Sequence, residues 1–507
     1  MAGRCRNPAD LLVVLAGEEA EEVILPPRVS LQAIVDEAIR HNVGVRIERS
    51  AVRDAAADVD VAIAPFDPRL SASGRVTQTE RATVGTATAG TQVDNRNYNV
   101  SVDKRFITGT ELGLSSGYTR RDSDASTDLT TLDYNSEVRA NLRQPILRGF
   151  GSTVNLANLR RAESRYAESR IRFRERILEI LANTENAYWE IAYAEARVRL
   201  LHSSIELAES VVEEARERLR LGLATELDVL RAQSTHASRK EETLNAERAL
   251  QDARDELLRQ IGRLEAPLIP DLVPVQMTLE DFAVEDLPES DPTIPEFVKS
   301  WDRALRNDPV IQQREEQLYQ REIDRRVARN NLRPSLDLVA SGALLGRDET
   351  AAFEAFDNAV NRDGHSWSLG VEFSVPWGTR ESRARLRQAD LRKEQTELQL
   401  IDRKSALYQQ VRRSWRDLQT SIDRVEASML TRELQARVYE QEEARYSAGM
   451  SATRDLLEAQ SDWDAARTRY LEALRSQMRA SVNLSRLDGT ILERHGFAWD
   501  DSEIFPE

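Results

Sequence analysis

The sequence has a single cysteine, Cys5, among its 507 residues. It therefore cannot form an intramolecular disulfide or a metal site built from cysteines. Glycine (21 residues), proline (16) and aromatic residues (6%) are also scarce, whereas 31% of the residues are charged. Because helix breakers are few and charges are many, this composition favours long amphipathic helices over a series of compact globular domains.

Long hydrophobic runs are absent as well. No apolar stretch has the length of a membrane-spanning helix, so a chain of this kind could cross a membrane only as a closed β-barrel. The formal charge of −16 argues against nucleic acid as a partner, because phosphate binding requires a basic surface. A solvated, acidic helical surface is the simplest explanation of this charge.

An enzymatic function has no support in the sequence. The five histidines are scattered without the spacing of metal ligands, and neither a glycine-rich phosphate loop nor a nucleophile elbow occurs. We therefore predict no catalytic residues, no metal site and no cofactor.

The N-terminal segment, residues 1–29, contains one short apolar stretch. Arg4 and Arg6 precede residues 11–17, which resemble the apolar part of an export signal but are few in number and follow the acidic Asp10. One interpretation of this segment is a degraded or mis-started export signal.

One motif occurs twice in the chain. Residues 218–234 align without a gap with residues 445–461, and Arg, Gly, Asp, Leu, Ala, Gln and Ser coincide at matching places. In each copy a long helical pattern stops at a glycine, Gly222 or Gly449, and a second helical pattern follows. This is an internal repeat, so we expect two similar halves.

The helical patterns before the two glycines are very long. In the first half the pattern extends over roughly 70 residues up to Leu221, on the order of 100 Å of helix. Its apolar and alanine residues recur in steps of seven at two heptad positions, which is typical of a coiled coil. The seam residues are Ile177, Thr184, Ile191, Val198, Ile205, Val212 and Leu219, with Ala187, Ala194, Leu201, Ala208 and Ala215. In the second half Val411, Trp415, Leu418, Ile422, Val425 and Met429 follow a similar pattern.

Each glycine is followed by the start of a return helix. Thr225 and Asp228 have the spacing of a capping box for a helix that ends near residue 261. Ser451 is the expected N-cap of the helix that ends near residue 487.

Between residues 66 and 146, and again between 334 and 377, the period changes to two. Tyr98, Val100 and Val102, for example, alternate with polar residues. Such strands fit a barrel wall with one face toward lipid and the other toward water. The first block is longer, 77 residues between its bounding prolines (145 − 68) against 42 (376 − 334). We expect the surplus to be a β-hairpin around residues 98–118.

These patterns predict the following organisation. The first repeat spans 30–264, with a helix at 30–64 capped by Ser30, strands at about 66–146 and a helical hairpin at 152–263. The second repeat spans 296–488, with a helix at 293–331, strands at about 334–377 and a helical hairpin at 380–487. An acidic, proline-rich linker at 265–295 joins the repeats, and residues 489–507 form a C-terminal tail.

The order of helix, strands, long helix, glycine turn and long helix, occurring twice, resembles the TolC-like outer-membrane efflux family (outer membrane factors). The most specific elements are the paired tips and the stretch from Gln144 to Gly151. The resemblance implies an α+β membrane protein: a homotrimer whose strands close one β-barrel in the outer membrane, continued by a periplasmic α-helical coiled-coil barrel. It also implies that the linker and the C-terminal segment form a belt around the helices. Implied partners are outer-membrane lipid, a periplasmic adaptor (membrane fusion protein) and an inner-membrane pump of the RND, ABC or MFS class.

Acidic residues mark the second tip. Asp455 and Glu458 are three apart at a helix start and so share one face. The resemblance implies that these positions line the periplasmic constriction, where a trimer would hold six carboxylates able to attract cations or bind divalent ions. Asp228 matches Asp455 in the other copy, and Arg231, in place of a second acid, could pair with a neighbouring tip's carboxylate. The alternative is that acids at a helix N-terminus are favoured by the helix dipole alone.

Apolar residues flank both glycine turns, and the resemblance implies that these tips meet the adaptor. The residues concerned are Leu221, Gly222 and Leu223 in the first tip and Ala448, Gly449 and Met450 in the second. A plain glycine helix stop with local apolar contacts is the alternative. The two roles are compatible, because exposed apolar side chains at a tip suggest a partner.

Aromatic residues in the strand blocks are candidates for girdles at the membrane surface. They are Trp367, Phe373, Trp377 and Tyr134. Ordinary packing aromatics are the alternative.

The leading hypothesis is an outer-membrane channel, the exit duct of a tripartite efflux or type I secretion system with a large periplasmic portion. A soluble coiled-coil scaffold is the rival, although it has no use for alternating strands of membrane-crossing length. A polymer-binding or adhesion protein is a third hypothesis, which predicts that deletion of residues 121–133 abolishes function. The cargo is not specified by the sequence, because in such systems the pump selects it.

Overall fold

The computed structural model describes residues 28–80, 92–123, 132–262, 283–288, 293–361 and 364–497. The candidate export signal, most of the predicted linker and the end of the C-terminal tail lie outside these residues. The chain divides into two compact units. The helical unit comprises residues 1–51, 170–313 and 401–507, and the sheet unit comprises residues 52–169 and 314–400.

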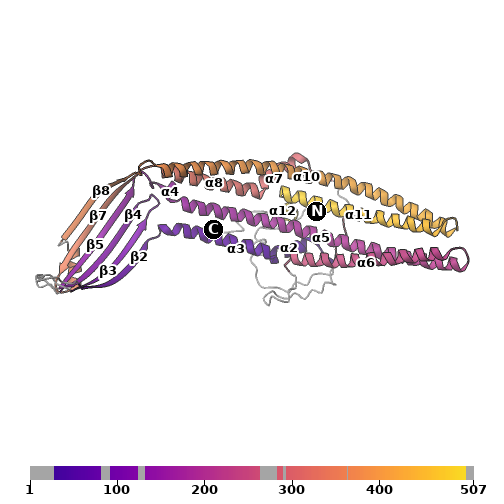
Figure 1. Ribbon diagram of the computed structural model, residues 1–507, viewed down its shortest axis with the longest axis horizontal. Helices are drawn as coiled ribbons and strands as arrows, with labels where there is room; N and C mark the ends of the chain where they lie inside the picture. The colour runs from indigo at the N-terminus through magenta and orange to yellow at the C-terminus, as the bar shows by residue number, and fades with distance from the viewer. Residues whose placement is uncertain are drawn as a thin grey trace. The chain divides into compact units, whose positions relative to one another are not determined.

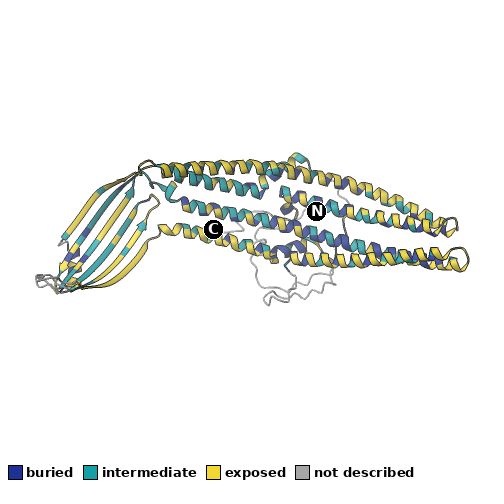
Figure 2. Ribbon diagram, viewed as in Figure 1, coloured by how far each residue is buried: buried dark blue, intermediate teal, exposed yellow. Residues whose placement is uncertain are grey.

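Two hairpins of long helices dominate the helical unit (Figure 1). α5 (Ala157–Arg220) pairs with α6 (Glu226–Gln260), and α10 (Arg380–Ser447) pairs with α11 (Thr453–Asp488). α5 and α10 each contribute residues to both units. The heptad positions predicted along α5 are buried or half-buried except Leu219, and Figure 2 shows this buried stripe. The seam prediction is therefore confirmed along most of α5.

Shorter elements complete the described chain. β1 (Arg28–Val29) pairs in parallel with β6 (Ala283–Val284) in the helical unit. Other short elements are α2 (Leu31–His41), α3 (Val43–Ile63), a 3-10 turn (Ala64–Phe66), α4 (Ser152–Asn155), α7 (Phe297–Asn307), α8 (Pro309–Asn330) and α12 (Thr490–Arg494). Ser30 caps α2 as predicted, because its Oγ accepts a hydrogen bond from the Ala33 N–H.

The prediction of one unbroken helix at 30–64 and another at 293–331 is wrong. α2 and α3 are separated at Asn42, and α7 and α8 are separated at Asp308. Both residues leave the helical backbone conformation, with ψ of 124° and 115°. Their side chains then accept hydrogen bonds from amides of the next helix, at 2.7 Å from the Gly44 N–H and 2.7 Å from the Ile311 N–H. An Asn or Asp side chain thus offers the backbone an alternative to a continuous helix.

The described residues of the sheet unit form six antiparallel strands in the order β2-β3-β4-β5-β7-β8. They are β2 (Arg69–Glu80), β3 (Gln92–Arg105), β4 (Glu111–Ser123), β5 (Leu132–Pro145), β7 (Ser335–Asp348) and β8 (Gly364–Ser374). The first half of the chain supplies four strands and the second half two. The additional pair, β3 and β4, is the hairpin expected around residues 98–118, with Tyr98 directly opposite Tyr118.

The strand register gathers apolar residues on one face of the sheet, which we call the apolar face. One row of opposed residues crosses all six strands: Leu70, Val102, Leu114, Ala140, Gly342 and Trp367. The opposite, polar face carries serine, asparagine and charged side chains, including Asp103, Glu111 and Arg143. Most large side chains of the apolar face are exposed to solvent in the single chain (Figure 2). The alternation read from the sequence is therefore a real division of the sheet into two faces.

A short helix, α9 (Ala352–Val360), connects β7 to β8 along the chain and packs on β7, β5 and β4. Ala355 and Ala359 are fully buried against Gly346 of β7. A Cβ atom at Gly346 would lie 2.1 Å from the Ala355 oxygen and 2.3 Å from the Ala359 nitrogen. Gly346 directly opposes Ser136 and alternates in phase with Gly342, so α9 rests on the apolar face.

Substitution of Gly346 by alanine is expected to lift α9 from the sheet. The added methyl group has no room against the backbone of α9, and such overpacking costs about 1–3 kcal/mol. Hydrogen–deuterium exchange of residues 352–360 should therefore become faster. Gly342→Ala is the matched control on the same strand and face, because within the described chain no non-neighbouring heavy atom lies within 4 Å of its added Cβ. Equal exchange in the two variants would contradict the close packing.

Candidate functional site

The tips of the two helical hairpins end in the same backbone motif. At the end of α5 the Leu223 N–H donates to the Arg218 oxygen at 2.8 Å and the Gly222 N–H donates to the Leu219 oxygen at 3.0 Å. At the end of α10 the corresponding distances, from Met450 to Arg445 and from Gly449 to Tyr446, are 2.8 and 2.9 Å. This pair of bonds is a Schellman motif, and both glycines have the positive φ, +74°, that it requires. The two halves of the chain thus terminate their long helices in the same way.

Both tips lie at the same end of the helical unit (Figure 1). Leu223 is 75% exposed and Met450 is 68% exposed, and Leu221 is also exposed. Gly222, Ala448 and Gly449 are exposed between them. Each tip therefore presents exposed apolar residues that no described part of the chain covers.

The acids of the second tip are also exposed. Asp455 and Glu458 lie in the first turns of α11. Glu458 Oε2 is 3.9 Å from Arg454 Nε, a solvent-exposed pair of the kind that contributes little to stability. Asp455 has no hydrogen bond or ion pair to another described side chain. Its carboxylate therefore has no side-chain partner among the described residues, and its place in the first turn of α11 is also one that the helix dipole favours.

The prediction that Ser451 caps α11 is wrong. The N-cap is Ala452, which makes no side-chain capping bond. The Ser451 hydroxyl instead donates to Glu442 Oε1 of α10. The serine is used to hold the turn to the preceding helix, so α11 begins one residue later than expected.

Asp228 of the first tip has a structural role. Its Oδ2 accepts hydrogen bonds from Thr225 Oγ1 at 2.6 Å and from the Thr225 N–H at 3.0 Å, and Thr225 Oγ1 accepts from the Asp228 N–H. This is the predicted capping box of α6. The bonds from Thr225, and then the nearby charge of Arg231, hold the pKa of Asp228 below its ordinary value. Arg231 is exposed and makes no ion pair with a tip carboxylate of the described chain.

The two hairpins pack together behind the tips. The shared cluster consists of Val211, Val212, Ala215, Val229, Ala232, Tyr439, Tyr446 and Leu456, with Leu457 and Trp463 at its edge. Arg218 of α5 lies over the ring of Tyr446 of α10, 3.7 Å from its centroid, and donates to the Tyr446 backbone oxygen. A cation–π contact and a charge-assisted hydrogen bond thus join the ends of α5 and α10.

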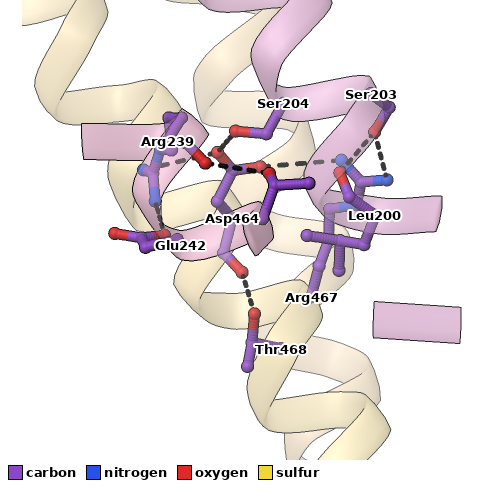
Figure 3. A network of polar contacts seen from close by, with 9 residues as sticks. Leu200, Ser203, Ser204, Arg239, Glu242, Asp464, Arg467 and Thr468 are labelled. Atoms are coloured by element: carbon purple, nitrogen blue, oxygen red, sulfur yellow. Dashed lines mark hydrogen bonds and ion pairs between the residues drawn. The ribbon is translucent and has the colours of Figure 1, made fainter. Parts of the chain in front are cut away.

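A polar network is buried between the hairpins further from the tips (Figure 3). At its centre Asp464 of α11 accepts a hydrogen bond from Ser204 Oγ of α5 at 2.5 Å. Arg239 of α6 lies 3.4 Å from Asp464 Oδ2, and Arg467 of α11 lies 3.6 Å from Oδ1. We call these four residues the Asp464 network. It links three helices from the two hairpins through one carboxylate.

Further partners hold the two arginines of the network. Arg239 Nη1 donates to Glu242 Oε2 at 2.9 Å, and Arg467 Nη2 donates to Ser203 Oγ at 3.1 Å. Burial raises the pKa of Asp464 above its ordinary value, against the opposing effects of Ser204 and the two arginines. We did not predict this network from the sequence. The sequence feature that could have indicated the network is Asp464 itself, an acidic residue in the buried stripe of α11, four residues after the buried Gln460.

Three of the four predicted girdle residues, Trp367, Phe373 and Tyr134, lie on the apolar face of the sheet unit. Trp367 and Phe373 of β8 are exposed there, and Trp377 is exposed after the end of the strand. Tyr134 of β5 belongs to a row of stacked rings, in which Tyr118 is 6.1 Å from Tyr98 and 6.1 Å from Tyr134 between centroids. The sheet therefore carries an aromatic row that includes two tyrosines absent from the prediction.

Among the described residues, no group of three or more His, Cys, Asp or Glu side chains is placed to hold a metal ion. No helix in the described ranges has the length and apolar character needed to cross a membrane.

A family profile and several solved structures match the chain. The profile of the family described as "Outer membrane efflux protein" matches residues 108–263 and 301–490. The chain is similar to the Campylobacter jejuni CmeC outer membrane channel, with 17% identity, a TM-score of 0.63 and coverage of 93% of this chain and 87% of that one. It is also similar to the Vibrio cholerae outer membrane protein VceC (15%, 0.64, 90% and 96%) and to the open Neisseria gonorrhoeae MtrE channel (19%, 0.62, 91% and 89%). None of the curated protein sequences matches the chain.

Proposed function

Because the chain belongs to the outer membrane efflux protein family, we propose that it is the outer-membrane exit duct of a tripartite efflux or type I secretion system. The apolar face that crosses all six strands is the observation that carries this proposal. A large exposed apolar face suits lipid, whereas a soluble scaffold would have to cover it. The duct is therefore favoured over the coiled-coil scaffold.

A homotrimer accounts for the unpaired edges of the sheet. β2 and β8 are edge strands, and an exposed edge is a template for pairing with another chain. If β8 of each copy pairs with β2 of the next, three six-stranded sheets close a barrel of 18 strands (3 × 6). Barrels of about 16–18 strands enclose an aqueous channel. The polar face would then line the channel and the apolar face would meet outer-membrane lipid.

In this assembly the helical unit is periplasmic, and the 30–264 and 296–488 repeats each supply one hairpin to its wall. Exposed apolar side chains on α6 and α10, such as Leu230, Leu430 and Leu434, would be covered by neighbouring copies. The exposed tips around Leu223 and Met450 would meet a periplasmic adaptor, which connects the duct to an inner-membrane RND, ABC or MFS pump. The pump supplies the energy and selects the cargo.

We assign the periplasmic gate to Asp455 and Glu458. Two observations support this role. Asp455 has no side-chain partner among the described residues, and Glu458 makes only an exposed ion pair with Arg454. In a trimer they form a ring of six acids, which attracts cations and can hold a divalent ion. We propose Arg231 of the first tip as the basic partner of this ring, whereas Asp228 contributes mainly by fixing the start of α6.

Conductance of the purified protein in planar bilayers tests the gate. Replacing Asp455 by Asn together with Glu458 by Gln should remove cation selectivity and weaken block by divalent ions about tenfold, because the ring loses its charge. Asp462→Asn, an exposed site on the same helix, is the control. Unchanged selectivity and block in the double variant would reject this gate.

Membrane fractionation tests the duct itself. We expect a trimer in the outer-membrane fraction that dissociates only on boiling. A soluble monomer or elongated dimer would reject both the duct and the trimer.

A further inference from the structure

The helix α9 leaves two different surfaces exposed. Its sheet side is formed by the buried Ala355 and Ala359. Phe353, Phe356 and Val360, spaced by three and four residues, form an exposed apolar flank, and Phe353 is 78% exposed. Glu354 and Asp357 form an exposed acidic flank beside it. A helix docked on a protein surface needs no such apolar flank unless something else covers it.

The apolar face of the sheet ends at the level of α9. Toward the start of β3, which lies beside the end of β4, the apolar face becomes charged. Along β3 it changes from Val102 and Val100, through Tyr98, to Arg96 and Asp94. On β4 the same change leads through Tyr118 to Arg120 and Asp122, which are 3.4 Å apart. The stacked tyrosine row thus separates an apolar band from a charged rim.

α9 is placed at this boundary by the strand register. Gly346, beneath α9, directly opposes Ser136, and Ser136 directly opposes Tyr118 of the tyrosine row. Ser136 is buried, as expected beneath the docked helix. The helix therefore rests beside the tyrosine row, where a lipid-facing surface gives way to a water-facing one.

We propose that α9 is an interfacial anchor, whose apolar flank inserts among the acyl chains of the outer leaflet while its acidic flank stays in water. This rests on the proposed function, because it needs the apolar face to meet lipid. Two properties favour lipid over a protein occupant. α9 rests on the same face of the sheet that carries the exposed apolar residues, and its own exposed residues divide into an apolar and an acidic flank, as in helices that lie in a membrane surface. Because the backbone of α9 packs directly on Gly346, the anchor is held against the sheet.

Single-cysteine spin labelling of the full chain tests the anchor, because Cys5 is the only native cysteine and can be replaced by serine. The trimer is reconstituted in vesicles of phosphatidylethanolamine and phosphatidylglycerol. Nitroxides at Phe353→Cys and Val360→Cys are compared with Asp357→Cys on the acidic flank. Collision with oxygen, which concentrates in lipid, is measured against collision with a water-soluble nickel chelate. The oxygen-to-nickel ratio at positions 353 and 360 should exceed that at 357 at least about fivefold, because the polar chelate is excluded from an apolar layer.

Two reference sites separate failure of the anchor from failure of the duct. Leu369→Cys reports on the apolar face of β8 and Ser368→Cys on its polar face. A high ratio at 369 with equal, low ratios at 353, 360 and 357 would overturn the anchor and leave the duct standing. A label at 353 that neither reagent reaches would show a protein cover and also overturn it. Low ratios at 369 and 368 alike would reject the lipid-facing sheet itself. Heat-sensitive trimer migration of each variant verifies folding.

Discussion

Leu369→Arg should strongly reduce the amount of trimer that inserts stably in the outer membrane. Leu369 is an exposed residue of the apolar face in the middle of β8. An arginine on the lipid face of a barrel costs about 2–4 kcal/mol near the middle of the bilayer. The trimer carries the substitution three times, so the total cost is comparable to the whole stability of many folded proteins. Quantifying the heat-sensitive trimer in outer-membrane fractions measures the effect.

The neighbouring residue provides the control. Ser368 lies at the same depth but on the polar face, where its Oγ is 2.8 Å from Ser341 Oγ. Ser368→Arg places the same charge toward the proposed aqueous channel, so it should lose only this exposed hydrogen bond. If Leu369→Arg and Ser368→Arg lost similar amounts of trimer, the apolar face would not lie in lipid while the polar face lies in water.

The large elements could be predicted because their signal is repeated along the sequence. Steps of seven along α5 and alternation on the strands each involve many residues, so a single exception such as Leu219 does not obscure them. The glycines at the tips were equally clear, because a positive φ after a long helix strongly favours glycine. The additional hairpin of β3 and β4 followed from the length difference between the halves.

The helix breaks were missed because a local bond competed with the periodicity. The apolar stripe continues past Asn42, but its side chain captures the Gly44 N–H and starts a new helix. At Asp308 the following proline was an available signal, because a residue before proline disfavours the helical conformation.

The helix α9 and the Asp464 network depend on tertiary contacts that the sequence does not spell out. α9 has only nine residues, too few for a clear periodicity. It packs on β7 at Gly346, where the absence of a side chain leaves room for its backbone. In the network, Ser204 and Arg239 come from the two helices of one hairpin, and Asp464 comes from the other hairpin, 260 residues after Ser204. Each residue alone is typical of a solvated helix surface, and only their packing buries them.

Asp464→Ala should destabilise the contact between the hairpins by about 3 kcal/mol per subunit, the lower end of the cost of breaking a buried ion pair. The lower end applies because Glu242 and Ser203 still hold the two arginines. Thermal loss of the helical circular dichroism signal of the trimer measures the effect, with the exposed Asp462→Ala as control. Asp464→Asn should cost less, because its amide oxygen can accept the Ser204 hydrogen bond. A melting temperature of Asp464→Ala equal to that of the control would contradict the structural role of the network.

The pH dependence of the same variants tests the charge of Asp464. Burial raises its pKa in the folded state, so the folded carboxyl keeps a proton at pH values where the unfolded one has lost it. Its contribution to stability is therefore greatest below the ordinary pKa, falls as the pH rises toward the raised value, and is constant above it. The wild type should gain stability relative to Asp464→Asn as the pH is lowered from 7 toward 4. The nearby charge of Glu242 also raises the pKa of Asp464, so the comparison is repeated with Glu242→Gln in both backgrounds. If the stability difference between the wild type and Asp464→Asn did not change with pH, Asp464 would be an ordinary ion-pair carboxylate. The expected increase of this difference at low pH would show that burial of Asp464 outweighs the attraction of Arg239 and Arg467.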